Sequence, residues 1–252
     1  MRSVLFIAAL FLTQLAFAQA ETVELSTFSK VIISPKIEAK FIPSETSKVV
    51  IIDSDVPEAD LNVVVKGNTL KVYIDDHKFF PKQQRQAINN GKMTTDLYED
   101  DAVEIIVYYE QLEKVVIRGD NDIIFKDQLQ ADKLTIKQFG DNDIRIDDLR
   151  ANELKVVLYG DSEFKVYSGQ VTRQRYRTYG DTDIDVDRLQ SKTARFRSYG
   201  DADAEVQADE RIKLFALGDQ SLRYSGTAKL RKTLVLGNTS IRKRGGLTKM
   251  YR

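Results

Sequence analysis

The chain has 252 residues, with 38 Lys and Arg against 38 Asp and Glu, so its formal net charge is zero, and it contains no cysteine. A balanced charge removes the bulk electrostatic argument for a nucleic-acid partner. The lack of cysteine excludes a disulfide framework, thiol catalysis and a lipid-modified N-terminal cysteine.

The first twenty residues are typical of a secretory signal peptide. Arg2 supplies a positive n-region, "VLFIAALFLTQLAF" an apolar h-region, and "AQA" at 18–20 a small-residue cleavage site. The apolar run is too short for a membrane anchor, and no second candidate span follows. We therefore expect residues 21–252 to form one exported domain, located in the periplasm or at the cell surface in association with the outer membrane.

Residues 21–110 have strand character without a regular period, and we expect them to form irregular N-terminal coils. The motif "KGNT" lies between two alternating runs and predicts a hairpin turn. The stretch 77–101 is polar, lacks alternation and is long for a loop in a compact fold. Phe79, Phe80 and Tyr98 are candidate contact residues in this loop, and a surface insertion without a role is the alternative.

Residues 111–241 carry an internal repeat. Gly-Asp begins at positions 119, 140, 160, 180, 200 and 218, and Gly237-Asn238 continues the series at the same interval. A fixed period near twenty residues predicts a solenoid, in which each unit packs only against its neighbours.

Apolar residues alternate with charged ones on both sides of each Gly-Asp, as in "LKVVLYGDSEFKV". This pattern predicts two half-buried strands per unit. Two strands of about five or six residues and two tight turns fill a twenty-residue coil, and such coils stack about 4.8 Å apart. The sequence therefore predicts an all-β protein, a two-sheeted parallel β-helix with about 20 residues per coil. An antiparallel sandwich would not demand such regular spacing.

Each glycine marks the corner between the two strands of a unit, where a positive φ or a close backbone approach is needed. The Asp that follows can accept a hydrogen bond from its own backbone two residues on. Stacking would also bring the aromatic residues before the glycines into a ladder, which comprises Phe139, Tyr159, Tyr179 and Tyr199.

Stacking also aligns the corner carboxylates. The first column is Asp120, Asp141, Asp161, Asp181, Asp201 and Asp219, and beside it lie Asp122, Asp143, Glu163, Asp183 and Asp203. Such a column is repulsive unless it is compensated, and calcium suits clustered oxygen ligands. The sequence favours a structural turn ladder without specific metal, with a calcium ladder as the alternative. No other cofactor is indicated.

Rows of basic and aromatic residues are expected on the outer strand faces. The candidate binding residues are Tyr159, Tyr179, Tyr199, Arg175, Arg177, Arg195 and Arg197. These residue types suit an anionic glycan or a protein partner.

The C-terminal end is basic. The segment 242–252, "RKRGGLTKMYR", contains no acidic residue. A basic tail can meet an anionic surface but is more often a solvated terminus. The open end of a solenoid must be capped or paired, so an oligomer is possible.

The residues required by familiar catalytic sites are mostly absent. The single histidine, His77, lies in the irregular loop, and there is no GxSxG, zinc-type or phosphate-loop motif. Paired carboxylates could still hydrolyse a glycosidic bond. We therefore expect a non-enzymatic binding protein, with a polysaccharide-processing enzyme or a purely structural envelope protein as alternatives.

The segments "FSKVIISPKIEAKFIPSETSKVVII" and "GNTLKVYI", together with the Gly-Asp corners that end in "LGDQSLRYSGTAKLRKTLVLGNTSI", resemble the GIN-domain family, the head domains of autotransporter-adhesin-like proteins of Bacteroidota. The resemblance covers roughly residues 28–241. It implies a right-handed β-helix similar to that of pectin lyases without their catalytic residues, and a role in cell-surface adhesion. Family members carry Gly-Ala-Ser or Gly-Ser-Gly corners, so the acidic corners depart from the pattern and no ligand is carried over.

Overall fold

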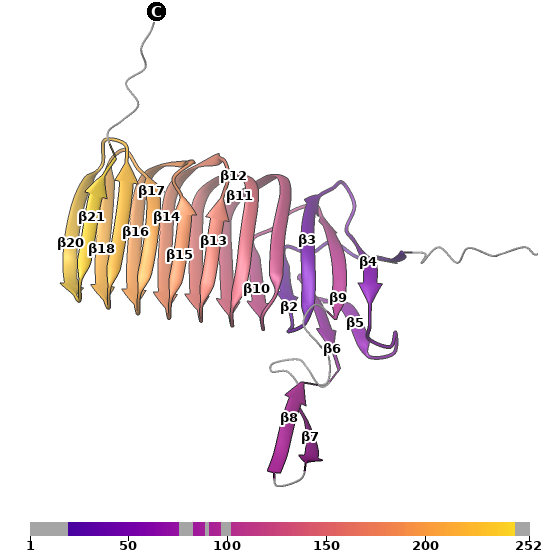
Figure 1. The fold of residues 1–252 in the computed structure, drawn as a ribbon. Helices are drawn as coiled ribbons and strands as arrows, with labels where there is room; N and C mark the ends of the chain where they lie inside the picture. The colour runs from indigo at the N-terminus through magenta and orange to yellow at the C-terminus, as the bar shows by residue number, and fades with distance from the viewer. Residues whose placement is uncertain (1–19, 76–82, 89–90, 97–101, 245–252) are drawn as a thin grey trace, which may run out of the picture.

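The computed structural model describes residues 20–75, 83–88, 91–96 and 102–244 (Figure 1). The described chain is all-β, a solenoid of about six turns with about 20 residues per turn. The prediction of a parallel β-helix is therefore confirmed. No helix in the described ranges is long and apolar enough to cross a membrane.

The strands form two sheets. The first sheet leads into the Gly-Asp corners and, in order, contains β5 (Leu61–Lys66), β6 (Thr69–Ile74), β2 (Lys30–Ile33), β10 (Lys114–Arg118), β11 (Asp122–Phe139), β12 (Asn142–Tyr159), β14 (Gly169–Tyr179), β16 (Leu189–Tyr199), β18 (Arg211–Leu217) and β20 (Lys229–Leu236). The second sheet leaves the corners and contains β1 (Glu21–Glu24), β4 (Lys48–Ser54), β9 (Val103–Tyr109), β3 (Ile37–Pro43), the first parts of β11 and β12, then β13 (Ser162–Val166), β15 (Thr182–Val186), β17 (Ala202–Gln207), β19 (Gln220–Ser225) and β21 (Thr239–Lys243). Because β11 and β12 belong to both sheets, all of these strands form one hydrogen-bonded ladder.

Residues one period apart lie side by side. Lys155 pairs with Arg175 and Leu158 with Thr178 in parallel register. Every second side chain points inward, so apolar residues stack in buried columns between the two sheets. One such column consists of Ile136, Val156, Tyr176, Phe196 and Leu214, none of which is more than 4% exposed. Each coil therefore buries its apolar side chains between its neighbours, as the alternation predicts.

The corner glycines bring successive coils into close backbone contact. Gly160 has φ +112° and donates its N–H to the carbonyl of Tyr179 in the next coil over 3.0 Å. A β-carbon on Gly160 would lie 2.5 Å from the carbonyl oxygen of Gly140. The sequence therefore needs glycine here for two reasons, the positive φ and the approach of the preceding coil.

The N-terminal end departs from the parallel pattern. Strands β5 and β6 form the antiparallel hairpin predicted from "KGNT", and β4 pairs antiparallel with both β1 and β9. Antiparallel strands thus cover this end of the coil stack. The stretch 77–101, expected to be an irregular loop, contains a second antiparallel hairpin, β7 (Gln83–Ile88) with β8 (Gly91–Asp96).

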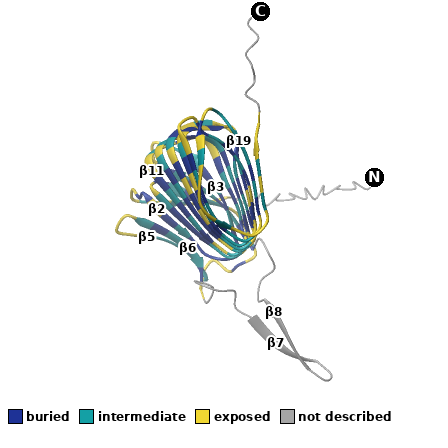
Figure 2. Cartoon of the chain, turned by 90° about the vertical axis from the view of Figure 1, so that its left-hand side faces the viewer, coloured by how far each residue is buried: buried dark blue, intermediate teal, exposed yellow. Residues whose placement is uncertain are grey.

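Among the described residues, no further strand pairs with β20 and β21, and in this sense the C-terminal coil is open. Strand β20 is exposed along most of its length, and Leu234 and Leu236 are 44% and 57% exposed (Figure 2). The predicted signal peptide at 1–20 lies almost wholly outside the described residues, as does the tail beyond residue 244. His77, Phe79, Phe80 and Tyr98 also lie outside them.

A corner glycine can be compared with a glycine that has open space. We expect Gly160→Ala to lower the free energy of unfolding of the 21–252 protein by about 2–4 kcal/mol, because it adds backbone strain to a clash with the preceding coil. Gly67→Ala should cost only about 1 kcal/mol, since Gly67 also has a positive φ but no atom lies within 4 Å of its added β-carbon. Urea unfolding measures both, and equal costs would contradict the close-approach argument.

Candidate functional site

The corner aspartates form a hydrogen-bonded ladder. At four steps the carboxylate of one coil accepts the backbone N–H of the residue in the same position of the next coil, over 2.8–3.0 Å. The pairs are Asp120 with Asp141, Asp141 with Asp161, Asp201 with Asp219, and Asp219 with Asn238. The predicted partner of each Asp was the backbone of its own turn. In the structure the bonds join coils, so these carboxylates have a structural task without any metal.

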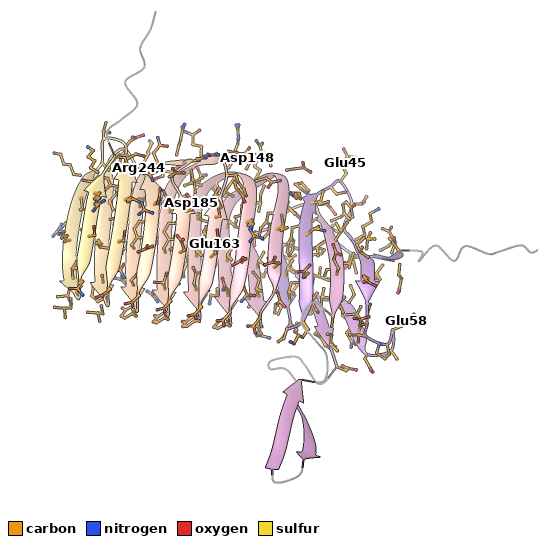
Figure 3. All side chains as sticks on the ribbon, in the orientation of Figure 1. Glu45, Glu58, Asp148, Glu163, Asp185 and Arg244 are labelled. Atoms are coloured by element: carbon orange, nitrogen blue, oxygen red, sulfur yellow. The ribbon has the colours of Figure 1, made fainter. Side chains whose placement is uncertain are left out.

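The corner aspartates are not gathered as a ligand set. Among the described residues, the one set of three carboxylates with oxygens within 4.8 Å of one another is Asp185, Asp187 and Glu205. Cations already contact this set. Lys165 lies 2.8 Å from Asp185, and Arg244 lies 3.1 Å from Asp187 and 2.6 Å from Glu205 (Figure 3). Asp185 and Glu205 lie one period apart in register, so the repeat was the signal that could have revealed this pair. The contact of Arg244 with Asp187 spans 57 residues, a separation that no periodicity signals.

The second acidic column lies on the outer face of the second sheet. Asp122, Asp143, Glu163, Asp183 and Asp203 stack in register on successive strands. Arg145 offsets the first two, with contacts of 3.5 Å to Asp122 and 2.8 Å to Asp143. Farther along, burial and then the charges of Asp203, Glu163 and Asp185 raise the pKa of the Asp183 carboxyl above its ordinary value.

The aromatic ladder forms as predicted. Ring centroids are 4.9 Å apart between Phe139 and Tyr159, 4.5 Å between Tyr159 and Tyr179, and 4.9 Å between Tyr179 and Tyr199, with interplanar angles of 7° or less. The rings therefore cover one another's faces. What the ladder presents outward is ring edges and the tyrosine hydroxyls, so a ligand meets hydroxyl groups rather than open ring faces.

Next to this ladder, on the same face of the first sheet, the structure brings the four predicted arginines together. Arg175 pairs with Arg195 and Arg177 with Arg197 on the adjacent strands β14 and β16. Arg175 lies 3.6 Å from Glu153. For Arg177, Arg195 and Arg197, no carboxylate in the described part of the chain lies within salt-bridge distance. We call this surface, the four arginines with Tyr159, Tyr179 and Tyr199, the basic-aromatic face.

Electrostatics on the basic-aromatic face are unfavourable in the isolated protein. Burial and then the charges of Arg197, Arg175 and Arg177 lower the pKa of the Arg195 guanidinium. Guanidinium groups remain charged at neutral pH, so this cluster retains uncompensated positive charge. An anion that contacted several of them would relieve the repulsion.

Two different outer faces thus flank the Gly-Asp corners of a β-solenoid, one basic and aromatic, the other acidic. The chain is therefore a repeat protein of the solenoid class, whose stacked coils present long, regular outer surfaces.

The family model described as "Putative auto-transporter adhesin, head GIN domain" matches residues 27–228, and the chain belongs to this family. The predicted membership is confirmed. None of the curated proteins gives a significant match.

Solved structures share the fold. A putative adhesin from Bacteroides fragilis NCTC 9343 is 21% identical, with a TM-score of 0.69, and the alignment covers 90% of this chain and 96% of that one. A putative lipid binding protein from Parabacteroides distasonis ATCC 8503 is 18% identical with a TM-score of 0.63 at the same coverages. A putative adhesin from Parabacteroides merdae ATCC 43184 is 14% identical with a TM-score of 0.56, again covering 90% and 96%.

The acidic column makes a pH-dependent prediction. Folding raises the pKa of Asp183, so ionisation of this carboxyl lowers the stability of the folded protein. This loss of stability is absent at a pH below the pKa that Asp183 has in the unfolded chain. We expect Asp183→Asn to raise the melting temperature at pH 7 and to leave it unchanged at pH 3.

Asp219→Asn is the control with the opposite sign. Hydrogen bonds from the backbone and then the side chain of Asn238 lower the pKa of Asp219, so its charged form is favoured on folding. That contribution is present at neutral pH and is lost as the pH falls through the folded pKa. This substitution should lower the melting temperature at pH 7 only. A rise at pH 7 in both variants would indicate a mere effect of net charge.

The corner ladder predicts a weak response to calcium, because its carboxylates already accept backbone hydrogen bonds. Free calcium at about a hundred times the dissociation constant of a site would raise the free energy of unfolding by about 2.7 kcal/mol. In a chain of this size that would raise the melting temperature by about 5–10 °C. We expect no such rise when the 21–252 protein is melted in about 5 mM calcium, which exceeds the dissociation constants of about 0.1–1 mM of extracellular calcium modules, and a rise of that size would contradict this prediction.

Proposed function

We propose that this protein is an exported, adhesion-like binding protein, and that its basic-aromatic face contacts an anionic glycan. The family description and the putative adhesins of the same fold support the class. The signal peptide predicted at residues 1–20 supports export to the periplasm or the cell surface. We infer that it acts by binding and not by catalysis.

The observation that carries the proposal is the group of three arginines beside the stacked tyrosines, Arg177, Arg195 and Arg197, that have no acidic partner in the described part of the chain. A guanidinium presents a planar fork of N–H donors that fits sulfate or carboxylate groups in a bidentate manner. The stacked rings of Tyr159, Tyr179 and Tyr199 lie beside these arginines, and a tyrosine hydroxyl can donate a hydrogen bond to the same kind of oxygen. Since coils repeat about every 4.8 Å, these donors form a row that suits a linear polyanion.

A glycan is favoured over a protein partner by the flatness and repetition of this surface. Protein interfaces depend on a few buried aromatic anchors in pockets, whereas here the aromatic faces are covered by one another. The binding that remains is electrostatic and polar, and it should weaken as salt screens the charges.

The test is a pair of charge-matched variants of the 21–252 protein, with immobilised heparin as the polyanion probe. We expect Arg177→Gln/Arg197→Gln to weaken binding at least tenfold, equivalent to about 1.4 kcal/mol or more. Lys126→Gln/Lys165→Gln, on the outer face of the second sheet, removes the same charge away from the basic-aromatic face and should have little effect. Biolayer interferometry at 50 and 300 mM NaCl, about 14 Å and 6 Å of screening length respectively, measures both. No heparin binding, or an equal loss in both variants, would rule out the proposal.

A further inference from the structure

A long groove lies away from the basic-aromatic face, on the side where each coil returns from the second sheet to the first. Its volume is about 1260 Å³, and it crosses several coils. One column of exposed side chains along it consists of Gln130, Arg150, Gln170 and Gln190, paired in register on β11, β12, β14 and β16. None of the three glutamine amides has a hydrogen-bond partner within the described part of the chain.

The floor of the groove is made of small residues. Ala131, Ala151, Val171 and Ser191 pair in register beside the glutamine column, and their side chains are half-buried or buried. On the other side of this floor, Asn152, Thr172 and further polar residues complete the lining. The groove therefore has a narrow small-residue floor between two polar walls.

The lining is balanced in charge. It contains four basic residues, Lys114, Lys133, Arg150 and Lys192, and four acidic ones, Glu110, Glu113, Asp132 and Asp209. Unlike the basic-aromatic face, it gives no net attraction to an anion. Between its balanced charges, the uncharged polar groups are amides and hydroxyls, which both donate and accept hydrogen bonds. Such groups match a ligand rich in neutral hydroxyls.

An extended peptide fits less well. Peptides in extended form are bound by a free strand edge, with pockets for alternate side chains. Here Ala151 is already paired on both sides, with Ala131 and Val171, and the floor residues are too small and regular to leave apolar pockets. The repeat of one amide per coil instead suits a polymer of identical polar units, and a pyranose chain advances by a distance similar to the coil spacing.

We propose that this groove binds an uncharged oligosaccharide lengthwise, with successive sugars hydrogen-bonded to the side chains of successive coils. The site is separate from the basic-aromatic face and does not depend on the function proposed for it. Since no aromatic residue of the described chain lines the groove, affinity comes from repeated hydrogen bonds. It must therefore grow with the number of sugars until the groove is filled.

The experiment uses the 21–252 protein and isothermal titration with the dimers and hexamers of cello-, laminari-, manno-, xylo- and maltooligosaccharides. We expect at least one hexamer to bind, its dimer to bind at least tenfold more weakly, and the affinity of the hexamer to be unchanged between 50 and 300 mM NaCl, about 14 Å and 6 Å of screening length. Gln170→Ala/Gln190→Ala should weaken the hexamer at least tenfold.

Arg177→Gln/Arg197→Gln is the matched control, because it changes exposed residues on the same strands β14 and β16. It should leave hexamer binding unchanged while it weakens heparin binding, so failure of either proposal is separable from failure of the other. Asn152→Trp, which places a large ring at an exposed position of the groove lining, should abolish hexamer binding with an unaltered circular dichroism spectrum. The proposal is overturned if no hexamer binds, if the glutamine variant retains full affinity, or if the same groove variants instead lose binding to an extended peptide library.

Discussion

Successive coils of this protein are held together at the Gly-Asp corners by backbone hydrogen bonds that leave no room for a β-carbon. Gly160 donates to the carbonyl of Tyr179 while its own Cα faces the carbonyl of Gly140. This contact fixes the register, and the register converts a linear period into columns of chemically similar side chains. The buried apolar column, the aromatic ladder and the two charged faces all depend on it. If one corner shifted, every column that crosses it would lose its alignment.

Columns of like charge are unfavourable, and the two faces deal with this differently. On the second sheet, cations from neighbouring columns lie among the acids: Arg145 contacts Asp122 and Asp143, and Arg244 bridges Asp187 and Glu205. On the basic-aromatic face of the first sheet the arginines are largely uncompensated, and of these four only Arg175 approaches a carboxylate in the described part of the chain. The acidic face is thus neutralised in part, with repulsion left around Asp183, while the basic-aromatic face keeps a repulsion that a ligand of opposite charge would relieve. The contrast is the reason for placing recognition on the first sheet.

The periodic part of the fold could be predicted from sequence because it rests on local signals that recur: a turn residue that only glycine satisfies, and period-two alternation on each side of it. The column of Tyr159, Tyr179 and Tyr199 followed from the same register. Other features could not be foreseen. The antiparallel pairing of β4 with β1 and β9 has no repeat, and the partner of an Asp141 carboxylate is a backbone N–H of the next coil, which composition does not indicate. The groove depends on how successive coils return from the second sheet to the first, a property of three-dimensional shape.

The open C-terminal coil has a consequence for how such a molecule changes over time. Because β18 and β19 receive β20 and β21 by the same parallel pairing that joins every earlier coil, duplication or loss of a twenty-residue segment adds or removes one rung and leaves the antiparallel N-terminal end intact. Both outer faces and the groove then lengthen or shorten together by the same increment. The length of the solenoid therefore changes in whole coils, and the length of its proposed recognition surfaces follows from the number of coils that the gene encodes.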